Sequence, residues 1–270
     1  MLLPPISDQE FAQFQNLFYK LVGIHLAPTK KTLVSGRLAK RLRHYKLKNY
    51  SDYLKLVTSE HHPDELQIMV NLLTTNETYF FREPAHFDYL RQMIIPLWQN
   101  KKNLRVWSAA CSSGEEAYSL AMVLMETLGE SIAWEVVATD VNIQMLEMAK
   151  AGQYLIEDAQ DLPQHYLTQY CLKGVRSQQG TFLIDKKIRH RVHFHQVNLH
   201  QELPSFLGHF DLIFLRNTLI YFDLPTKQHI IRRLLSLLKA DGYFVIGHAE
   251  SLMGVTDKLY SVAPTVYKKR

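Results

Sequence analysis

The first quarter of the chain carries apolar residues at the spacing of a helix. Phe11, Phe14 and Phe18 recur every three or four positions, which is the period of one helical face. Ser7 and Glu10 form the S-x-x-E pattern of a capping box at the start of this run. The same period continues to about residue 73, with no pattern typical of a strand. We expect helices over 7–23, 32–45, 51–58 and 63–73.

From about residue 100, short apolar runs alternate with amphipathic segments. Runs such as LRVWS and DLIFL are typical of buried strands. Strands that alternate with helices predict an α/β fold with a mostly parallel sheet, covered by helices on both faces. Two short runs near the end, 259–262 and 265–268, could pair with each other. We expect strands at 104–108, 134–139, 192–197, 211–215 and 243–246, and helices at 115–128, 142–151 and 226–239.

One segment interrupts this alternation. It contains two glycines and the alternating runs TFLID and RVHFH, which are typical of antiparallel strands. We expect a small antiparallel β insert at about 168–195. The chain should then divide into an all-helical N-terminal domain at 1–75, a linker that begins the catalytic region at 76–99, and an α/β domain at 100–270.

Composition and charge narrow the class of protein further. The 270 residues are 47% hydrophobic and 21% charged, as in an ordinary globular protein. The two cysteines lack a CxxC spacing, so we expect reduced thiols in a cytosolic protein. We find no signal peptide pattern and no apolar run of about 18–20 residues, so we expect a cytoplasmic protein without membrane insertion. The net charge of +5 suits either plain solubility or an acidic partner.

Small or polar residues follow several of the expected strands. The first strand leads through SAACSSG into a helix start, where free N–H groups face a ligand. Asp140 ends the next strand and could accept hydrogen bonds from a ribose, or could simply cap the following helix. Asn198, Arg216 and Asn217 end two later strands. Because ligands lie outside the carboxyl ends of such strands, these residues predict a site for a nucleoside without a diphosphate.

Six segments together resemble the signature of the CheR family of chemotaxis receptor glutamate methyltransferases. The resemblance covers almost the whole chain, and the combination of TNETxFFR with RNxxIYF is highly specific. The chain departs from the pattern at Ala117, where many members have proline, and at Ala249, where many have serine. The matching segments are LLTTNETYFFREPAHF (72–87), SAACSSGEEAYSLAM (108–122), ATDVN (138–142), VNL (197–199), FDLIFLRNTLIYFD (210–223) and GHAESL (247–252).

The resemblance implies a Rossmann-like class I methyltransferase that uses S-adenosylmethionine and releases S-adenosylhomocysteine. Its product would be glutamate methyl esters on methyl-accepting chemoreceptors. Arg82 and Tyr221 would face the methyl group and the incoming carboxylate. A carboxylate is already ionised at neutral pH, so neither a general base nor a metal is expected. The residues that would hold the cofactor are Asn76, Thr78, Arg82, Glu116, Asp140, Asn198, Leu199, Arg216 and Asn217.

Basic side chains are concentrated on the helix expected at 32–45. Arg37, Lys40, Arg41 and Arg43 either form a solvated face or guide an acidic helical substrate, such as receptor cytoplasmic helices. Nucleic acid is not expected, because no motif for it is present. In some members of the family the β insert binds a receptor tail peptide by strand pairing, and the sequence leaves this open here.

We expect the enzyme to act as a monomer. The sequence also leaves two other functions open. One is a non-catalytic regulator that binds S-adenosylmethionine or S-adenosylhomocysteine and docks to receptors. The other is a methyltransferase for a different substrate.

Overall fold

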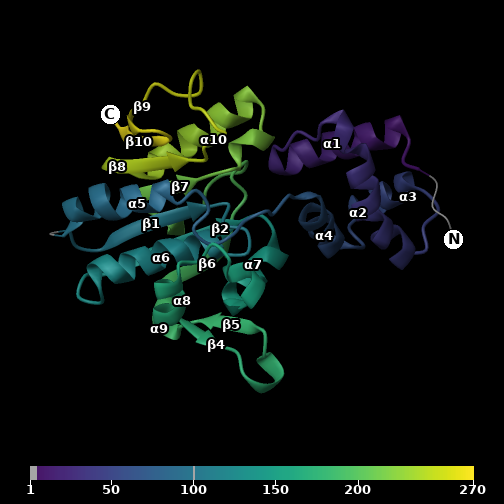
Figure 1. Ribbon diagram of the computed structural model, residues 1–270. Coiled ribbons are helices and arrows are strands. Elements are labelled where there is room, and N and C mark those ends of the chain that lie inside the picture. The colour runs from purple at the N-terminus through teal and green to yellow at the C-terminus, as the bar shows by residue number, and fades with distance from the viewer. Residues whose placement is uncertain (1–4, 100) are drawn as a thin grey trace.

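Four helices form the N-terminal part of the computed structural model, which describes residues 5–99 and 101–270 (Figure 1). The capping box of Ser7 and Glu10 is present at the start of the first helix, and Gly23 ends that helix with a left-handed φ of 73°. The apolar faces of the helices share one core, in which Phe14 and Phe18 are fully buried. Residues 1–4 of the predicted helical domain lie outside the described residues. The helices are α1 (Asp8–Val22), α2 (Lys31–His44), α3 (Tyr50–Val57) and α4 (Pro63–Leu73).

Three short helical turns follow, which the sequence pattern does not predict. They are α5 (Ala85–Tyr89), a π-helical turn η2 (Leu90–Ile94) and a 3-10 turn η3 (Ile95–Trp98). Their apolar side chains join the core on one face of the main sheet. This packing places residues 80–87 against the carboxyl ends of the strands.

The main sheet has seven strands in the order β6-β2-β1-β7-β8-β10-β9. All neighbouring pairs from β6 to β8 are parallel, and only β10 pairs antiparallel with β8 and β9. The strand order runs outward in both directions from β1, so a crevice opens between the carboxyl ends of β1 and β7. The strands are β1 (Leu104–Ala109), β2 (Trp134–Asp140), β6 (Val192–Gln196), β7 (Phe210–Leu215), β8 (Leu238–Ile246), β9 (Leu259–Ala263) and β10 (Val266–Lys269).

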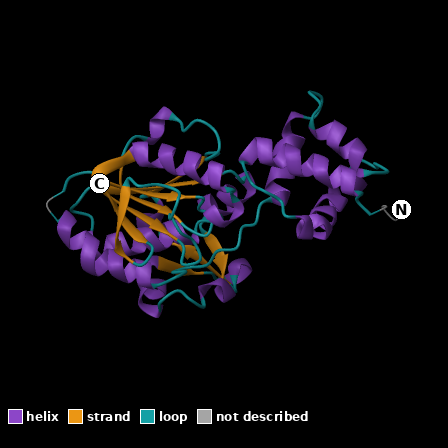
Figure 2. Ribbon diagram, turned by 90° about the horizontal axis from the view of Figure 1, so that it is seen from above, coloured by secondary structure: helices purple, strands orange, loops and turns teal. Residues whose placement is uncertain are grey.

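Helices cover both faces of this sheet (Figure 2). Successive residues of a strand point to opposite faces, so Val106 belongs to one core and Trp107 to the other. The first core includes α6 (Glu115–Leu128), and the second includes α10 (Leu224–Leu237). The α/β fold with a mostly parallel sheet is therefore confirmed.

A second, three-stranded antiparallel sheet has the order β3-β5-β4. It comprises β3 (Gln153–Leu155), β4 (Cys171–Lys173) and β5 (Thr181–Ile184), and it follows α7 (Ile143–Ala151). The predicted insert at about 168–195 is corrected at both ends. The small sheet begins at residue 153, because β3 is too short to show an alternating pattern. Residues 192–195 belong to β6 of the main sheet.

The helical domain sits on the carboxyl ends of the main sheet. Asn142 Nδ2 donates to Asn71 O at 3.1 Å, and Tyr19 donates to Asp223 at 2.9 Å. The His25 N–H donates to Tyr221 O at 3.0 Å. The two parts therefore close over the crevice between them. None of the helices in the described ranges combines the length and apolar character that crossing a membrane requires.

Candidate functional site

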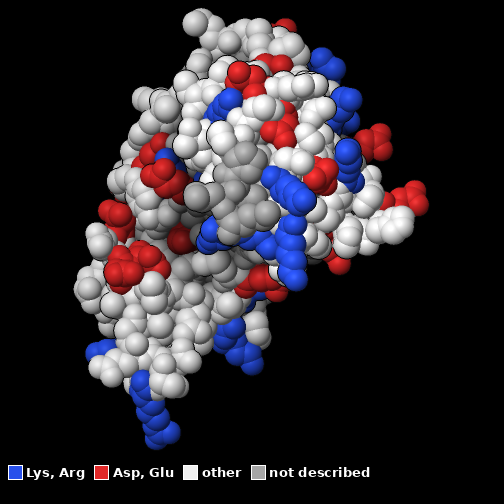
Figure 3. Space-filling view, turned by 90° about the vertical axis from the view of Figure 1, so that its right-hand side faces the viewer, with Lys and Arg blue, Asp and Glu red and all other residues white. Residues whose placement is uncertain are grey.

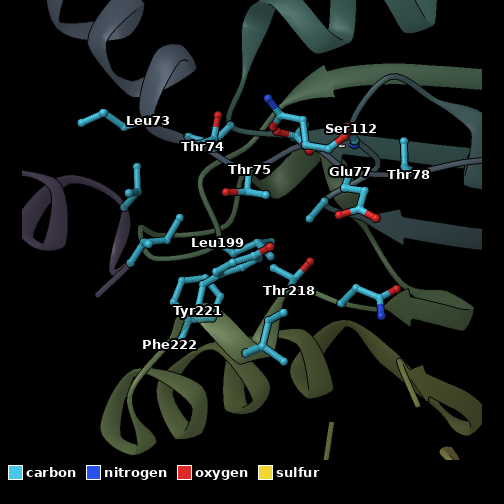
Figure 4. A pocket seen from close by; sticks show the side chains of 18 of the residues that line it. Leu73, Thr74, Thr75, Glu77, Thr78, Ser112, Leu199, Thr218, Tyr221 and Phe222 are labelled. Carbon is cyan, nitrogen blue, oxygen red and sulfur yellow. Dashed lines mark hydrogen bonds between the residues drawn. The ribbon is translucent and has the colours of Figure 1, made fainter. Parts of the chain in front are cut away.

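A cavity of about 340 Å³ lies between the helical domain and the carboxyl ends of β1, β2 and β7. This volume is in the range of small-molecule sites. Figure 4 shows Thr75 at the end of the helical domain, with Glu77 and Thr78 of the linker, on one side of it, and Thr218 and Tyr221 on the other. The ten side chains predicted for catalysis and cofactor binding all line this cavity: Asn76, Thr78, Arg82, Glu116, Asp140, Asn198, Leu199, Arg216, Asn217 and Tyr221.

The loop between β1 and α6 turns sharply under the cavity. Ala110 and Ser112 adopt left-handed φ angles of 69° and 49°, and Gly114 has a φ of 99°. A side chain at Gly114 would also meet the Ala149 Cβ at 2.8 Å, so glycine is required there. Left-handed residues other than glycine carry strain, and such strain tends to occur at functional sites. The turn presents the loop backbone and the start of α6 to the cavity.

Asp140 holds this loop and keeps acceptor capacity for a ligand. Its Oδ2 accepts from the Ser112 N–H, and its Oδ1 accepts from the Asn142 N–H, both at 2.8 Å. A carboxylate has about four lone-pair positions, so each oxygen can take one more donor, such as a ribose hydroxyl. Burial raises the pKa of Asp140. The alternative that Asp140 caps the next helix is wrong, because Asn142 is the N-cap of α7.

Glu116 and Arg216 form a buried ion pair at the other side of the cavity. Arg216 Nε donates to Glu116 Oε2 at 2.8 Å, and Ser108 donates to Glu116 Oε1 at 2.6 Å. Arg216 Nη1 also donates to Arg82 O at 2.7 Å. The pair therefore joins β1, α6, β7 and the linker at one point.

The turn after β7 is organised by a buried carboxylate, Glu250. Its two oxygens accept from the N–H groups of Asn217, Thr218, Leu219 and Gly247 at 2.6–2.9 Å. Asn217 has a left-handed φ of 54°. A Cβ at position 247 would lie 2.6 Å from Asn217 Nδ2, so a glycine lets the two strand ends approach.

Glu83 ties the linker to the ends of β7 and β8. Its Oε1 accepts from Asn217 Nδ2 and from the His248 N–H, both at 3.1 Å, and its Oε2 lies 3.2 Å from Arg216 Nη1. Burial alone would raise the pKa of Glu83, but the hydrogen bonds from Asn217 and His248 lower it. Glu83, His86 and His248 also bring three ligand atoms within 4.8 Å of one another. The Arg216 guanidinium already bonds two of them, so the protein itself supplies a cation at this cluster.

Arg82 and Tyr221 approach the cavity from different elements. Arg82 Nη1 donates to Glu77 O at 2.7 Å, and the guanidinium lies over the Tyr79 ring at 5.6 Å. Tyr221 ends the short turn η7 (Leu219–Tyr221), where its carbonyl accepts from His25. Both side chains are partly exposed, so they can meet a substrate at the mouth of the cavity.

Asn198 binds the helical domain as well as lining the cavity. Its Nδ2 donates to Leu21 O at 2.7 Å, and its Oδ1 accepts from the His200 N–H at 3.0 Å. Its neighbour Leu199 is buried and offers an apolar wall. An aromatic ring such as adenine would therefore meet Leu199 and the flank of Asn198, whose polar atoms already have partners.

The chain matches two family models along nearly its whole length. The model of the CheR methyltransferase all-alpha domain matches residues 9–74, and that of the CheR methyltransferase SAM binding domain matches residues 76–268. This chain belongs to the CheR methyltransferase family. The family predicted from the sequence motifs is thus confirmed, together with its character as an S-adenosylmethionine-dependent methyltransferase.

Relatives from the CheR family match along nearly the full length. A chemotaxis protein methyltransferase of Klebsiella aerogenes is 39% identical over 97% of this chain and 90% of its own length. The chemotaxis protein methyltransferase 2 of Pseudomonas aeruginosa is 38% identical over 97% and 93%. The chemotaxis protein methyltransferase of Escherichia coli is 38% identical over 97% and 91%. Both the helical domain and the α/β domain of this chain are therefore shared with them.

The basic residues of α2 in this CheR protein are of two kinds. Arg37 Nη1 donates to Thr74 O at 2.8 Å, and Arg41 Nε donates to the buried Glu65 Oε1 at 2.7 Å. Both side chains, which the sequence placed with Lys40 and Arg43 on a solvated or docking face, therefore form hydrogen bonds within the helical domain. Lys40 and Arg43 are exposed. Figure 3 shows basic side chains gathered on this face of the molecule, with acidic ones between them.

The sequence assigned no role to four residues that line the CheR cavity or bond the residues that line it. Glu83 and Glu250 lie inside two of the matching segments, where an unexplained carboxylate was the available signal. His25 and Leu26 of the helical domain line the cavity itself. Nothing in the local sequence points to these two, because the segment reaches the cavity only when the domains pack together.

Proposed function

We propose that the protein methylates glutamate side chains on the cytoplasmic helices of chemoreceptors, and that it works in the cytoplasm. The observation that carries this proposal is the single cavity lined by all ten predicted side chains, with Arg82 and Tyr221 partly exposed at its mouth. The division of labour would follow the chain: residues 1–75 dock the substrate and close the cavity, and the α/β domain holds the cofactor.

The residues of the cavity fit S-adenosylmethionine in three regions. Leu199 and Leu26 offer apolar surface to the adenine ring, and Asp140 keeps one acceptor position on each oxygen for the ribose. Glu116 and Arg216 together present opposite charges to the amino and carboxylate groups of the methionine part. When bound, the cofactor supplies a methyl group on a cationic sulfur, and the electron pair of the broken carbon–sulfur bond stays on the sulfur.

The side chains at the mouth align the incoming carboxylate. Arg82 can hold one carboxylate oxygen by charge-assisted hydrogen bonds, and the Tyr221 hydroxyl can donate to it as well. The free oxygen lone pair then forms the bond to the methyl carbon, and no proton needs to be removed. Alignment and exclusion of water by the two packed domains supply the rate enhancement.

Docking of the receptor would involve the exposed cations of α2. Lys40 and Arg43 point to solvent on the helical domain, where an acidic receptor helix can approach them. The edge strands of the small sheet could add a receptor tail peptide, as in some family members. We propose that the protein binds the receptor helix and the tail peptide as a monomer.

Transfer of radiolabelled methyl groups to receptor cytoplasmic fragments tests the proposal. We expect label in the fragments, and its release as a volatile product after base treatment, because a methyl ester hydrolyses to methanol. Label that resists base would indicate a different acceptor group. Tight cofactor binding without transfer to any receptor fragment would support the non-catalytic regulator instead.

A further inference from the structure

A chain of hydrogen bonds runs from the cavity to the C-terminal hairpin, through Arg216 and His86, which are buried, to Thr265, which is partly buried. Arg216 lines the cavity, and its Nη1 lies 3.1 Å from His86 Nδ1. On the other side of the ring, His86 Nε2 lies 2.6 Å from Thr265 Oγ1. Thr265 is in the turn between β9 and β10, far in sequence from both partners. Arg216, His86 and Thr265 together form a unit that we term the Arg216 support.

The chemistry of these groups fixes the direction of each hydrogen bond. A guanidinium only donates, so His86 Nδ1 must accept, and the ring carries its hydrogen on Nε2. His86 therefore donates to Thr265 Oγ1, which in turn donates to Pro264 O at 2.6 Å. Burial first, and then the Arg216 charge, lower the pKa of His86 to about 3, so the ring is neutral. Glu83 and His248 also face the ring, and Glu83 shares the Arg216 Nη1 group.

The backbone at Thr265 indicates that its hydroxyl has a use. Thr265 has a left-handed φ of 58°, a conformation that β-branched residues rarely adopt and that glycine or asparagine would take more easily. The strain must be offset by the surroundings. The Thr265 hydroxyl makes two hydrogen bonds that can offset it, a local one to Pro264 O and one to the buried His86, and of the two only the His86 bond leads toward the cavity.

We propose that Thr265 and His86 are positioning residues that hold Arg216 in register with the cofactor site. Arg216 Nη1 also donates to Arg82 O at 2.7 Å, so the same support places the backbone of a candidate catalytic residue. The C-terminal hairpin thereby positions both the Arg216 side chain and the Arg82 backbone without contacting a ligand itself. This inference depends on the proposed function only where it predicts an effect on the rate of methyl transfer. The predicted effect of the Arg216 support on cofactor affinity does not depend on the receptor.

A pair of variants at position 265 separates the hydroxyl from the packing. Thr265→Val keeps the branched shape and removes the hydroxyl, which leaves the His86 Nε2–H buried without a partner. Thr265→Ser keeps the hydroxyl. We expect calorimetry to show about tenfold weaker binding of S-adenosylhomocysteine to Thr265→Val. Thr265→Ser should bind within about twofold of wild type. Ser261→Ala is the matched control, because Ser261 Oγ donates only within the same hairpin, to Ala263 O.

Unchanged affinity in Thr265→Val, with only a lower melting temperature, would overturn the inference, because it would reduce Thr265 to a packing role. Should Thr265→Val not fold, a second pair decides. His86→Asn places an amide oxygen near the Nδ1 position and keeps the acceptor for Arg216, whereas His86→Leu removes it. Weaker binding in the leucine variant than in the asparagine variant supports the inference, and equal binding contradicts it.

The same experiments keep the two proposals apart. If wild-type protein methylates no receptor fragment but the Thr265→Val variant still binds S-adenosylhomocysteine about tenfold more weakly, the proposed function fails and the Arg216 support stands. If receptor methylation is established and none of the variants changes cofactor affinity or the KM for S-adenosylmethionine, the Arg216 support fails alone.

Discussion

Replacement of Glu250 by glutamine tests how the turn after β7 is built. The carboxylate accepts four backbone hydrogen bonds, from Thr218 and Leu219 on one oxygen and from Asn217 and Gly247 on the other. A glutamine amide has one oxygen and one NH₂ group. In either orientation, two of the four N–H groups would therefore face a donor and lose their partner.

The size of the effect follows from those contacts. A hydrogen bond to a charged group contributes about 1.5–3 kcal/mol, so the loss of two amounts to about 3–6 kcal/mol. The offset is the removal of a buried charge, because burial raises the pKa of Glu250 and so makes its ionisation less favourable than in water. We therefore expect Glu250→Gln to lower the free energy of unfolding by about 2–4 kcal/mol. Cofactor binding should weaken as well, because Asn217 lines the cavity.

Urea denaturation at neutral pH measures the first effect, and calorimetric titration with S-adenosylhomocysteine measures the second. The exposed Glu130 provides a control, because Glu130→Gln removes a carboxylate of the same type from a helix end without this network. A change of less than about 0.5 kcal/mol in Glu250→Gln, as for an ordinary surface substitution, would refute the reasoning. It would mean that the turn holds its shape without the carboxylate.

Three further predictions concern other parts of the protein. Arg41→Glu should destabilise the helical domain by about 3–5 kcal/mol in urea denaturation, because it leaves the buried Glu65 carboxylate without its cationic partner. Arg43→Glu should lower receptor methylation without changing stability or cofactor affinity. Folding lowers the pKa of His86 from 6.5 to about 3. The free energy of unfolding should therefore decrease as the pH falls below about 6.5, by about 1.4 kcal/mol per pH unit. Urea denaturation from about pH 7 to about pH 5 should show this extra slope in wild type and not in His86→Leu. Asp140→Asn should weaken S-adenosylhomocysteine binding about tenfold in calorimetry, and an unchanged affinity would place the ribose elsewhere.

The helical and strand periods of the sequence predicted most of the fold. The four N-terminal helices and most strands of the main sheet lie within a few residues of their expected ranges, because each buries a regular apolar face. The start of β8 was predicted wrongly: the strand begins at Leu238, inside the helix expected at 226–239, and not at residue 243. The misses are short elements. β3 has three residues and α5 has five, which is too few for a period to appear, and both form because they pack against an existing sheet.

The candidate site was predicted as a set of residues but not as a set of contacts. The polar residues at strand ends line one cavity as expected, because parallel strands bring their carboxyl ends to one edge. The partners of these residues were not predictable from spacing. Arg216 contacts Glu116 and Glu83, which are 100 and 133 positions away. For the same reason the sequence could not distinguish Arg41, whose partner is Glu65, from the exposed Arg43.

The helical domain both carries the proposed docking residues and closes the cavity, and deletion of the domain would remove both roles at once. It carries the exposed Lys40 and Arg43, and its segment after α1 lines the cavity through His25 and Leu26. The His25 N–H also holds the Tyr221 carbonyl, so removal of residues 1–75 would open the cavity and release a candidate catalytic residue. Loss of methylation in such a truncation would therefore say nothing about docking. Because Arg43 has an exposed side chain on a helix that keeps its own core, single charge reversal there changes the docking surface alone.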